Sequence, residues 1–118
     1  MQKHSRITPE GRAFWYTERL WSLASQLPVK PIRIDDIEDF DENCWFREPP
    51  TCREVAKHAR QILEADLSFP VLLHADGRLM DGVHRLAKAW LQGETEVKAQ
   101  RFETDPAPDW VETGPGQA

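Results

Sequence analysis

The stretch LMDGVHRLAKAWLQG, residues 79–93, places four residues that could do chemistry next to one another. Asp81, Gly82, His84 and Arg85 stand at the start of a segment whose apolar residues recur at helical spacing. A helix start exposes free backbone N–H groups and a partial positive charge, and a preceding glycine lets an anion approach closely. Arginine can bind a phosphate with two parallel hydrogen bonds. The stretch therefore predicts a phosphate-binding site.

The same residues also have a purely structural interpretation. Asp81 is a good helix N-cap, and His84 and Arg85 would then be exposed on the first helical turn. If the stretch binds a phosphate instead, Asp81 could hold a metal ion or accept a proton from a hydroxyl group. Both interpretations stay open from the spacing alone, because short glycine-containing motifs are weak evidence.

Other side chains could contribute to the same site. His58 borders the apolar face of a predicted helix, where it would contact a phosphate or simply pack. Trp45 and Phe46 would cover a nucleotide base or fill the core. Asp66 closes the same helix near the predicted hairpin, as a pocket acid or a surface acid. The acidic run 35–42 could hold a metal ion, although a solvated loop is the usual role of such a run.

Local patterns predict the elements that would position these residues. Thr8 and Pro9 suit the first turn of a helix, Thr51 and Glu54 form a capping box, and Asp76-Gly77 is a turn signal. The expected order is helix 8–27, a strand within 27–37, an acidic loop, helix 50–67, hairpin 69–81, helix 83–92 and strand 96–103. This order predicts a mixed α/β fold, with a small mixed sheet and flanking helices.

Composition limits the classes of function. The chain has 118 residues, enough for one domain, and a net charge of −5, which disfavours a broad basic face for duplex DNA. Cys44 and Cys52 do not form a CxxC pair, so we expect free thiols. No apolar run could cross a membrane, and the first ten residues do not resemble a secretion signal, so we expect a cytoplasmic protein without membrane partners.

With its preceding elements, the stretch DGRLMDGVHRLAKAWLQG resembles the ParB/sulfiredoxin fold family. Members share an early strand, a helix, and a strand pair that leads into the N-terminal end of a second helix. This helix start, which we call the helix mouth, has a Gly-x-x-Arg motif. The resemblance covers roughly residues 28–102. It implies a nucleotide-binding core over 28–103, with the expected N-terminal helix over 1–27 packed on it and a mostly irregular tail over 104–118.

Three kinds of relative refine this resemblance. ParB partition proteins bind CTP and carry a DNA-binding domain, for which this chain has no room. Sulfiredoxins have Gly-Cys-His-Arg at the mouth, whereas Val83 stands here at the position of the nucleophilic cysteine. Free-serine kinases have a similar Asp-Gly mouth, which implies Asp81 as a catalytic acid and metal ligand, and Glu38 as the nearest match to their second acid. The phosphate-binding residues would be Gly82, Val83, His84 and Arg85, joined by His58.

The resemblance implies a small nucleotide-binding protein that uses a nucleoside di- or triphosphate with Mg²⁺. It would act as a phosphotransferase on a small-molecule acceptor or as a nucleotide hydrolase. One alternative is a non-catalytic module that senses a nucleotide, and another is a ParB-like regulatory protein related to DNA partitioning. The segment 1–27 would either pack on the core or form a homodimer.

Overall fold

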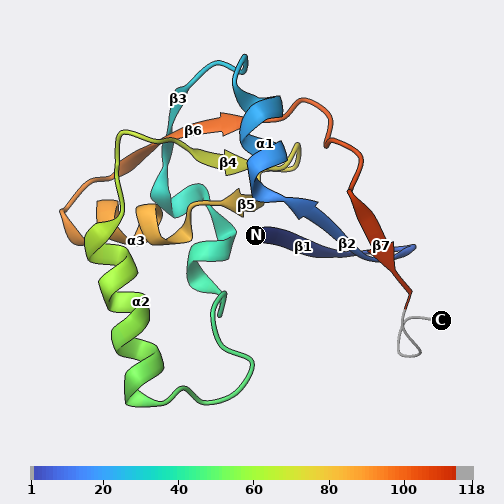
Figure 1. The fold of residues 1–118 in the computed structure, drawn as a ribbon. Coiled ribbons are helices and arrows are strands. Elements are labelled where there is room, and N and C mark those ends of the chain that lie inside the picture. The colour runs from blue at the N-terminus through green and yellow to red at the C-terminus, as the bar shows by residue number, and fades with distance from the viewer. Residues whose placement is uncertain (1, 114–118) are drawn as a thin grey trace.

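The computed structural model describes residues 2–113, which form three α-helices and two β-sheets (Figure 1). The mixed α/β fold class is therefore confirmed. The elements are β1 Lys3–Thr8, β2 Gly11–Tyr16, α1 Thr17–Ala24, β3 Lys30–Arg33, the 3-10 turns η1 Ile34–Asp36 and η2 Glu38–Asp41, α2 Cys52–Glu64, β4 Val71–Leu73, β5 Leu79–Asp81, α3 Val83–Leu91, β6 Glu96–Arg101 and β7 Trp110–Glu112.

A four-stranded sheet in the order β3-β6-β4-β5 forms the centre of the fold. It is mixed, because β4 runs parallel to β6 while the other two pairs are antiparallel. Successive residues of a strand point to opposite faces. Val71 and Leu73 of β4 accordingly join a core cluster with α3, whereas Leu72 joins a second cluster with α1 and β2. Burial on both faces explains why β4 is apolar throughout.

The second sheet corrects the prediction of a helix over 8–27. Residues 3–16 form the β1–β2 hairpin, and only Thr17–Ala24 is helical. Pro9 and Glu10 form its turn rather than a first helical turn, with Gly11 beyond them at φ 133°. Burial alternates from residue to residue along β2, as in a strand with one face against the core, and Trp15 is one of the buried residues. Tertiary packing thus overrides the weak helical pattern.

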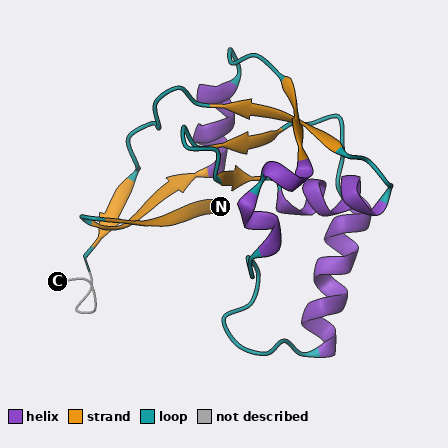
Figure 2. Ribbon diagram, turned by 180° about the vertical axis from the view of Figure 1, so that it is seen from behind, coloured by secondary structure: helices purple, strands orange, loops and turns teal. Residues whose placement is uncertain are grey.

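The C-terminal segment also differs from the expected irregular tail. Of 104–118, the structure describes residues up to 113, and Trp110–Glu112 forms β7 against β2. The Trp110 ring stacks on Phe14 with centroids 4.8 Å apart. The hairpin and this strand form the three-stranded sheet β1-β2-β7, which lies beside the central sheet (Figure 2). Residues 114–118 lie outside the described part of the chain.

Helix α2 projects away from the sheets (Figure 1). Its predicted capping box between Thr51 and Glu54 is confirmed. The predicted apolar face of this helix is largely exposed: Val55 is 50% exposed, Leu63 is 73% exposed and no residue of α2 is fully buried. The helix packs along one side against α3, so the residues of its apolar face are at most half-buried. Among residues 2–113, no helix has the length and apolarity needed to span a membrane.

Candidate functional site

The predicted helix mouth lies where β5 ends and α3 begins. Gly82 is the N-cap residue, with φ 110° and ψ 23°, and no side chain caps the helix. A Cβ at Gly82 would lie 2.8 Å from Cγ1 of Val71 and 2.9 Å from Nη2 of Arg85, so no larger residue fits without displacement. The first turn of α3 therefore presents its backbone N–H groups and partial positive charge without a side-chain cap.

Asp81 is bound by two neighbours instead of capping the helix. Its Oδ2 accepts hydrogen bonds from Nη2 of Arg85 and from Nε1 of Trp21, each 2.8 Å long. The Asp81 and Arg85 side chains are 19% and 16% exposed, respectively. Because Gly82 occupies the N-cap position, the interpretation of Asp81 as a cap is wrong. Nε of Arg85 is buried and, within residues 2–113, has no hydrogen-bond partner.

His84 pairs with His58, which brings two predicted site residues together. Nδ1 of His58 lies 2.9 Å from Nε2 of His84, and the Trp45 ring stacks on both imidazoles at centroid distances of 4.6 and 4.9 Å. Burial, followed by the charges of His58 and Arg85, lowers the pKa of His84. In this contact one of the two facing nitrogens donates its proton and the other accepts.

A pocket of about 1000 Å³ opens in front of this mouth. This volume is at the upper end of the range for small-molecule sites. Its walls come from β1, the loop after η2, the end of α2 and the β5–α3 junction, and they include the predicted residues Asp81, Gly82, Val83, His84, Arg85, Trp45 and Asp66. Trp21 and Phe69 add apolar surface. The pocket thus combines aromatic walls with charges of both signs.

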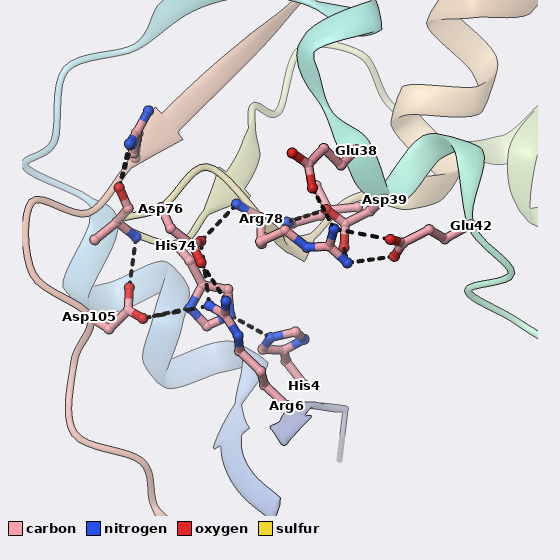
Figure 3. A network of polar contacts seen from close by, with 12 residues as sticks. His4, Arg6, Glu38, Asp39, Glu42, His74, Asp76, Arg78 and Asp105 are labelled. Carbon is pink, nitrogen blue, oxygen red and sulfur yellow. Dashed lines mark hydrogen bonds and ion pairs between the residues drawn. The ribbon is translucent and has the colours of Figure 1, made fainter. Parts of the chain in front are cut away.

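The structure places Glu38 away from the pocket lining, whereas Asp39 and Glu42 of the same acidic run line it. The Glu38 side chain is 79% exposed and accepts a 3.0 Å hydrogen bond from Nη1 of Arg78. Arg78 also pairs with Asp39 and Glu42 (Figure 3). Much of the acidic run therefore surrounds one guanidinium, which lowers the pKa of Glu42. The role of Glu38 as a second catalytic acid stays a prediction.

Within the described residues, no group of three or more histidine, cysteine or acidic side chains is placed to hold a metal ion. Asp81 would offer a single carboxylate to Mg²⁺, which commonly takes one or two protein carboxylates and completes its shell with phosphate and water. The predicted Mg²⁺ would therefore depend on the nucleotide for most of its ligands. Cys44 and Cys52 are free thiols, as predicted.

Three further polar residues, His4, His74 and Asp105, were not among the predicted site residues (Figure 3). His74 is fully buried at the end of β4, between the pocket residue His4 and Asp105 of the segment after β6. A histidine directly after the apolar run Val71–Leu73 was the one sequence signal for this cluster. His4 was missed because the hairpin that carries it was not predicted.

Comparisons with protein-family models, with curated proteins and with solved structures gave no match to this chain.

Proposed function

We propose that this protein binds a nucleoside di- or triphosphate in the pocket, with its phosphates at the mouth of α3. The main support for this proposal is that the N-terminus of α3, which has no side-chain cap, opens into this pocket beside His84 and Arg85. Helix N-termini bind phosphates through backbone N–H groups and the helix dipole. The resemblance to the ParB/sulfiredoxin family agrees with this position, because its mouth motif coincides with Gly82–Arg85.

Arg85 supplies the main side-chain donor in this proposal. One of its guanidinium nitrogens, Nη2, binds Asp81, while the buried Nε lacks a partner among the described residues. A phosphate oxygen would accept a hydrogen bond from this Nε–H. The contact would remove the cost of an unpaired buried polar group, about 1–3 kcal/mol. The Asp81 contact fixes the guanidinium in place before the ligand arrives. Preorganised donors of this kind bind phosphate at a smaller entropic cost.

The bound nucleotide would serve phosphoryl transfer to a small acceptor or to water, with Mg²⁺ bridging the phosphates. Phosphoryl transfer depends mainly on positioning and on neutralisation of charge. Asp81 lies beside the mouth and could orient a metal-bound water or an acceptor hydroxyl. The Trp45 ring, stacked over the histidine pair, and the Trp21 and Phe69 side chains offer apolar surface for a base.

A non-catalytic sensor is the second candidate. The observation that favours it is the double engagement of Asp81 Oδ2 by Arg85 and Trp21, which neutralises much of the carboxylate's charge. In a sensor, ligand phosphates would draw Arg85 away from Asp81. A catalyst would bind the nucleotide without losing this contact. Phosphate release on nucleotide addition distinguishes the two, because a sensor binds the nucleotide without turning it over.

Thermal unfolding with ATP, ADP, CTP and GTP, each with Mg²⁺, tests the proposal. Binding at a ligand concentration 100 times Kd adds about 2.7 kcal/mol to the free energy of unfolding, which is readily seen as a rise in Tm. Arg85→Ala should abolish the rise, while Arg60→Ala, at an exposed arginine of α2, should retain it. If none of the four nucleotides raises Tm, the proposal is wrong. If the rise persists in Arg85→Ala, the site is elsewhere.

A further inference from the structure

A chain of hydrogen bonds leads from the pocket to a buried histidine and then to a carboxylate. Nε2 of His4 lies 2.8 Å from Nε2 of His74, and Nδ1 of His74 lies 2.8 Å from Oδ2 of Asp105. The other oxygen, Oδ1, accepts a 2.8 Å hydrogen bond from the backbone N–H of Ala75. The three side chains come from β1, the end of β4 and the segment after β6 (Figure 3).

The chemistry of these atoms fixes where the protons reside. An ionised carboxylate only accepts hydrogen bonds, so Nδ1–H of His74 donates to Asp105. In neutral His74 the other nitrogen, Nε2, must then accept, which makes His4 the donor through its Nε2–H. The remaining nitrogen of His4, Nδ1, carries a lone pair. His4 lines the pocket, which makes this lone pair the proton acceptor that the chain of hydrogen bonds offers to a ligand.

We propose that His4, His74 and Asp105 form a proton relay for the pocket, in which His4 Nδ1 takes a proton from a water or acceptor hydroxyl that attacks the bound nucleotide. His4 is the catalytic residue, and His74 and Asp105 are positioning residues. This inference rests on the proposed nucleotide binding and adds the group that would activate the nucleophile.

The steps balance in atoms and charge. The O–H bond of the water or hydroxyl breaks, and its oxygen forms a bond to the terminal phosphorus. The bond between that phosphorus and the bridging oxygen breaks, and the shortened nucleotide leaves with the electron pair. As His4 Nδ1 gains a proton, the proton on its Nε2 passes to Nε2 of His74. The positive charge then resides on His74, 2.8 Å from the Asp105 carboxylate.

The surroundings of His4 favour transfer of this charge over its retention. Burial and the neighbouring His74 lower the pKa of His4 to about 4, Arg6 acts in the same direction, and Asp81 and Asp105 oppose it. His4 therefore holds a proton poorly by itself, whereas His74 has a carboxylate in direct contact.

The indole of Trp15 holds the two imidazoles in position. It stacks on His4 with centroids 5.6 Å apart and meets His74 edge-on at 5.4 Å. Its own Nε1 donates a 2.8 Å hydrogen bond to the carbonyl of Pro106, which follows Asp105 directly. The same contacts therefore fix the relay and the chain segment that carries its carboxylate.

Long-range ¹H–¹⁵N NMR of the histidine rings tests the relay geometry. At pH 8 we expect Nε2–H on His4 and Nδ1–H on His74. In Asp105→Asn the amide oxygen would keep the Ala75 contact, and the amide N–H would face Nδ1 of His74. Both histidines should then switch to the opposite tautomer, because each facing nitrogen must exchange its donor or acceptor role. Unchanged tautomers in the variant, or Nδ1–H on His4 in the wild type, would overturn the relay.

Phosphate release from Mg²⁺ complexes of ATP, ADP, CTP and GTP tests the chemistry. His4→Gln should slow release by at least about 100-fold, within the usual contribution of a general base, and keep the nucleotide-induced rise in Tm. Asp105→Asn should slow it less, and Ile7→Thr, at an exposed residue of β1, serves as the control. A Tm rise without release, or with equal release from His4→Gln, overturns the relay and leaves nucleotide binding intact. No Tm rise overturns both.

Discussion

Replacing Gly82 by alanine should be among the most damaging single changes at the candidate site. Gly82 has a φ of 110°, which L-residues rarely adopt, and its Cβ position is already occupied. The added methyl group would lie 2.8 Å from Cγ1 of Val71 and 2.9 Å from Nη2 of Arg85. Val71 is fully buried in the core, so it has little freedom to move away.

Two costs combine in this variant. A non-glycine residue in a sparsely populated backbone region costs about 1–3 kcal/mol. Overpacking a well-filled core costs about 1–3 kcal/mol more. We therefore expect Gly82→Ala to lower the free energy of unfolding by about 2–6 kcal/mol, a large part of the roughly 5–15 kcal/mol typical of a whole domain. The Arg85–Asp81 contact should also weaken, because the methyl group displaces Nη2.

Gly93 offers a matched control. It also has a positive φ, 83°, but a Cβ there would have no atom within 4 Å. Gly93→Ala should therefore pay only the backbone cost of about 1–3 kcal/mol, without the steric cost. Urea unfolding followed by tryptophan fluorescence measures both variants. If Gly82→Ala is no less stable than Gly93→Ala, the steric argument for a glycine at the mouth is wrong.

Three further outcomes follow from the contacts. Asp81→Asn should cost about 2 kcal/mol of stability, measured by urea unfolding, because it removes the charge that binds Arg85 in a largely buried pair. The pKa of His4 is lowered from 6.5 to about 4 in the folded state, so below pH 6.5 the unfolded chain binds a proton that the folded chain does not. The free energy of unfolding should therefore decrease as the pH falls from 6.5 to 4, by at most about 3 kcal/mol. His4→Gln should flatten this slope in unfolding curves. Trp45→Ala should raise the pKa of His84 in an NMR titration, because it exposes a ring whose pKa burial lowers.

The sequence predicted those parts of the fold whose signals are local. The capping box at Thr51, the turn at Asp76-Gly77 and the glycine before α3 each depend on a few neighbouring residues. The N-terminal hairpin could not be predicted in this way. Its strand β2 is stabilised by β7, about 100 residues away in the chain, and by the burial of Trp15 in one core cluster with Leu72 and Phe102.

The candidate site was predicted only in part for the same reason. Asp81 to Arg85 are contiguous, so their common position at one helix mouth follows from local structure. The pairing of His58 with His84 needs α2 to pack on α3, and the contact between Asp81 and Trp21 needs α1 to lie against β5. His4 joined no predicted site because its neighbour His74 is 70 positions away.

Titration of ¹⁵N-labelled protein with ATP and Mg²⁺ tests nucleotide binding at the α3 mouth most directly. The backbone N–H signals of Val83, His84 and Arg85, and the Nε–H signal of Arg85, should shift together and saturate at one Kd. Adenosine, which lacks phosphates, should leave them nearly unchanged. Binding of ATP that shifts only signals far from these residues, or equal shifts with adenosine, would contradict a phosphate site at the N-terminus of α3.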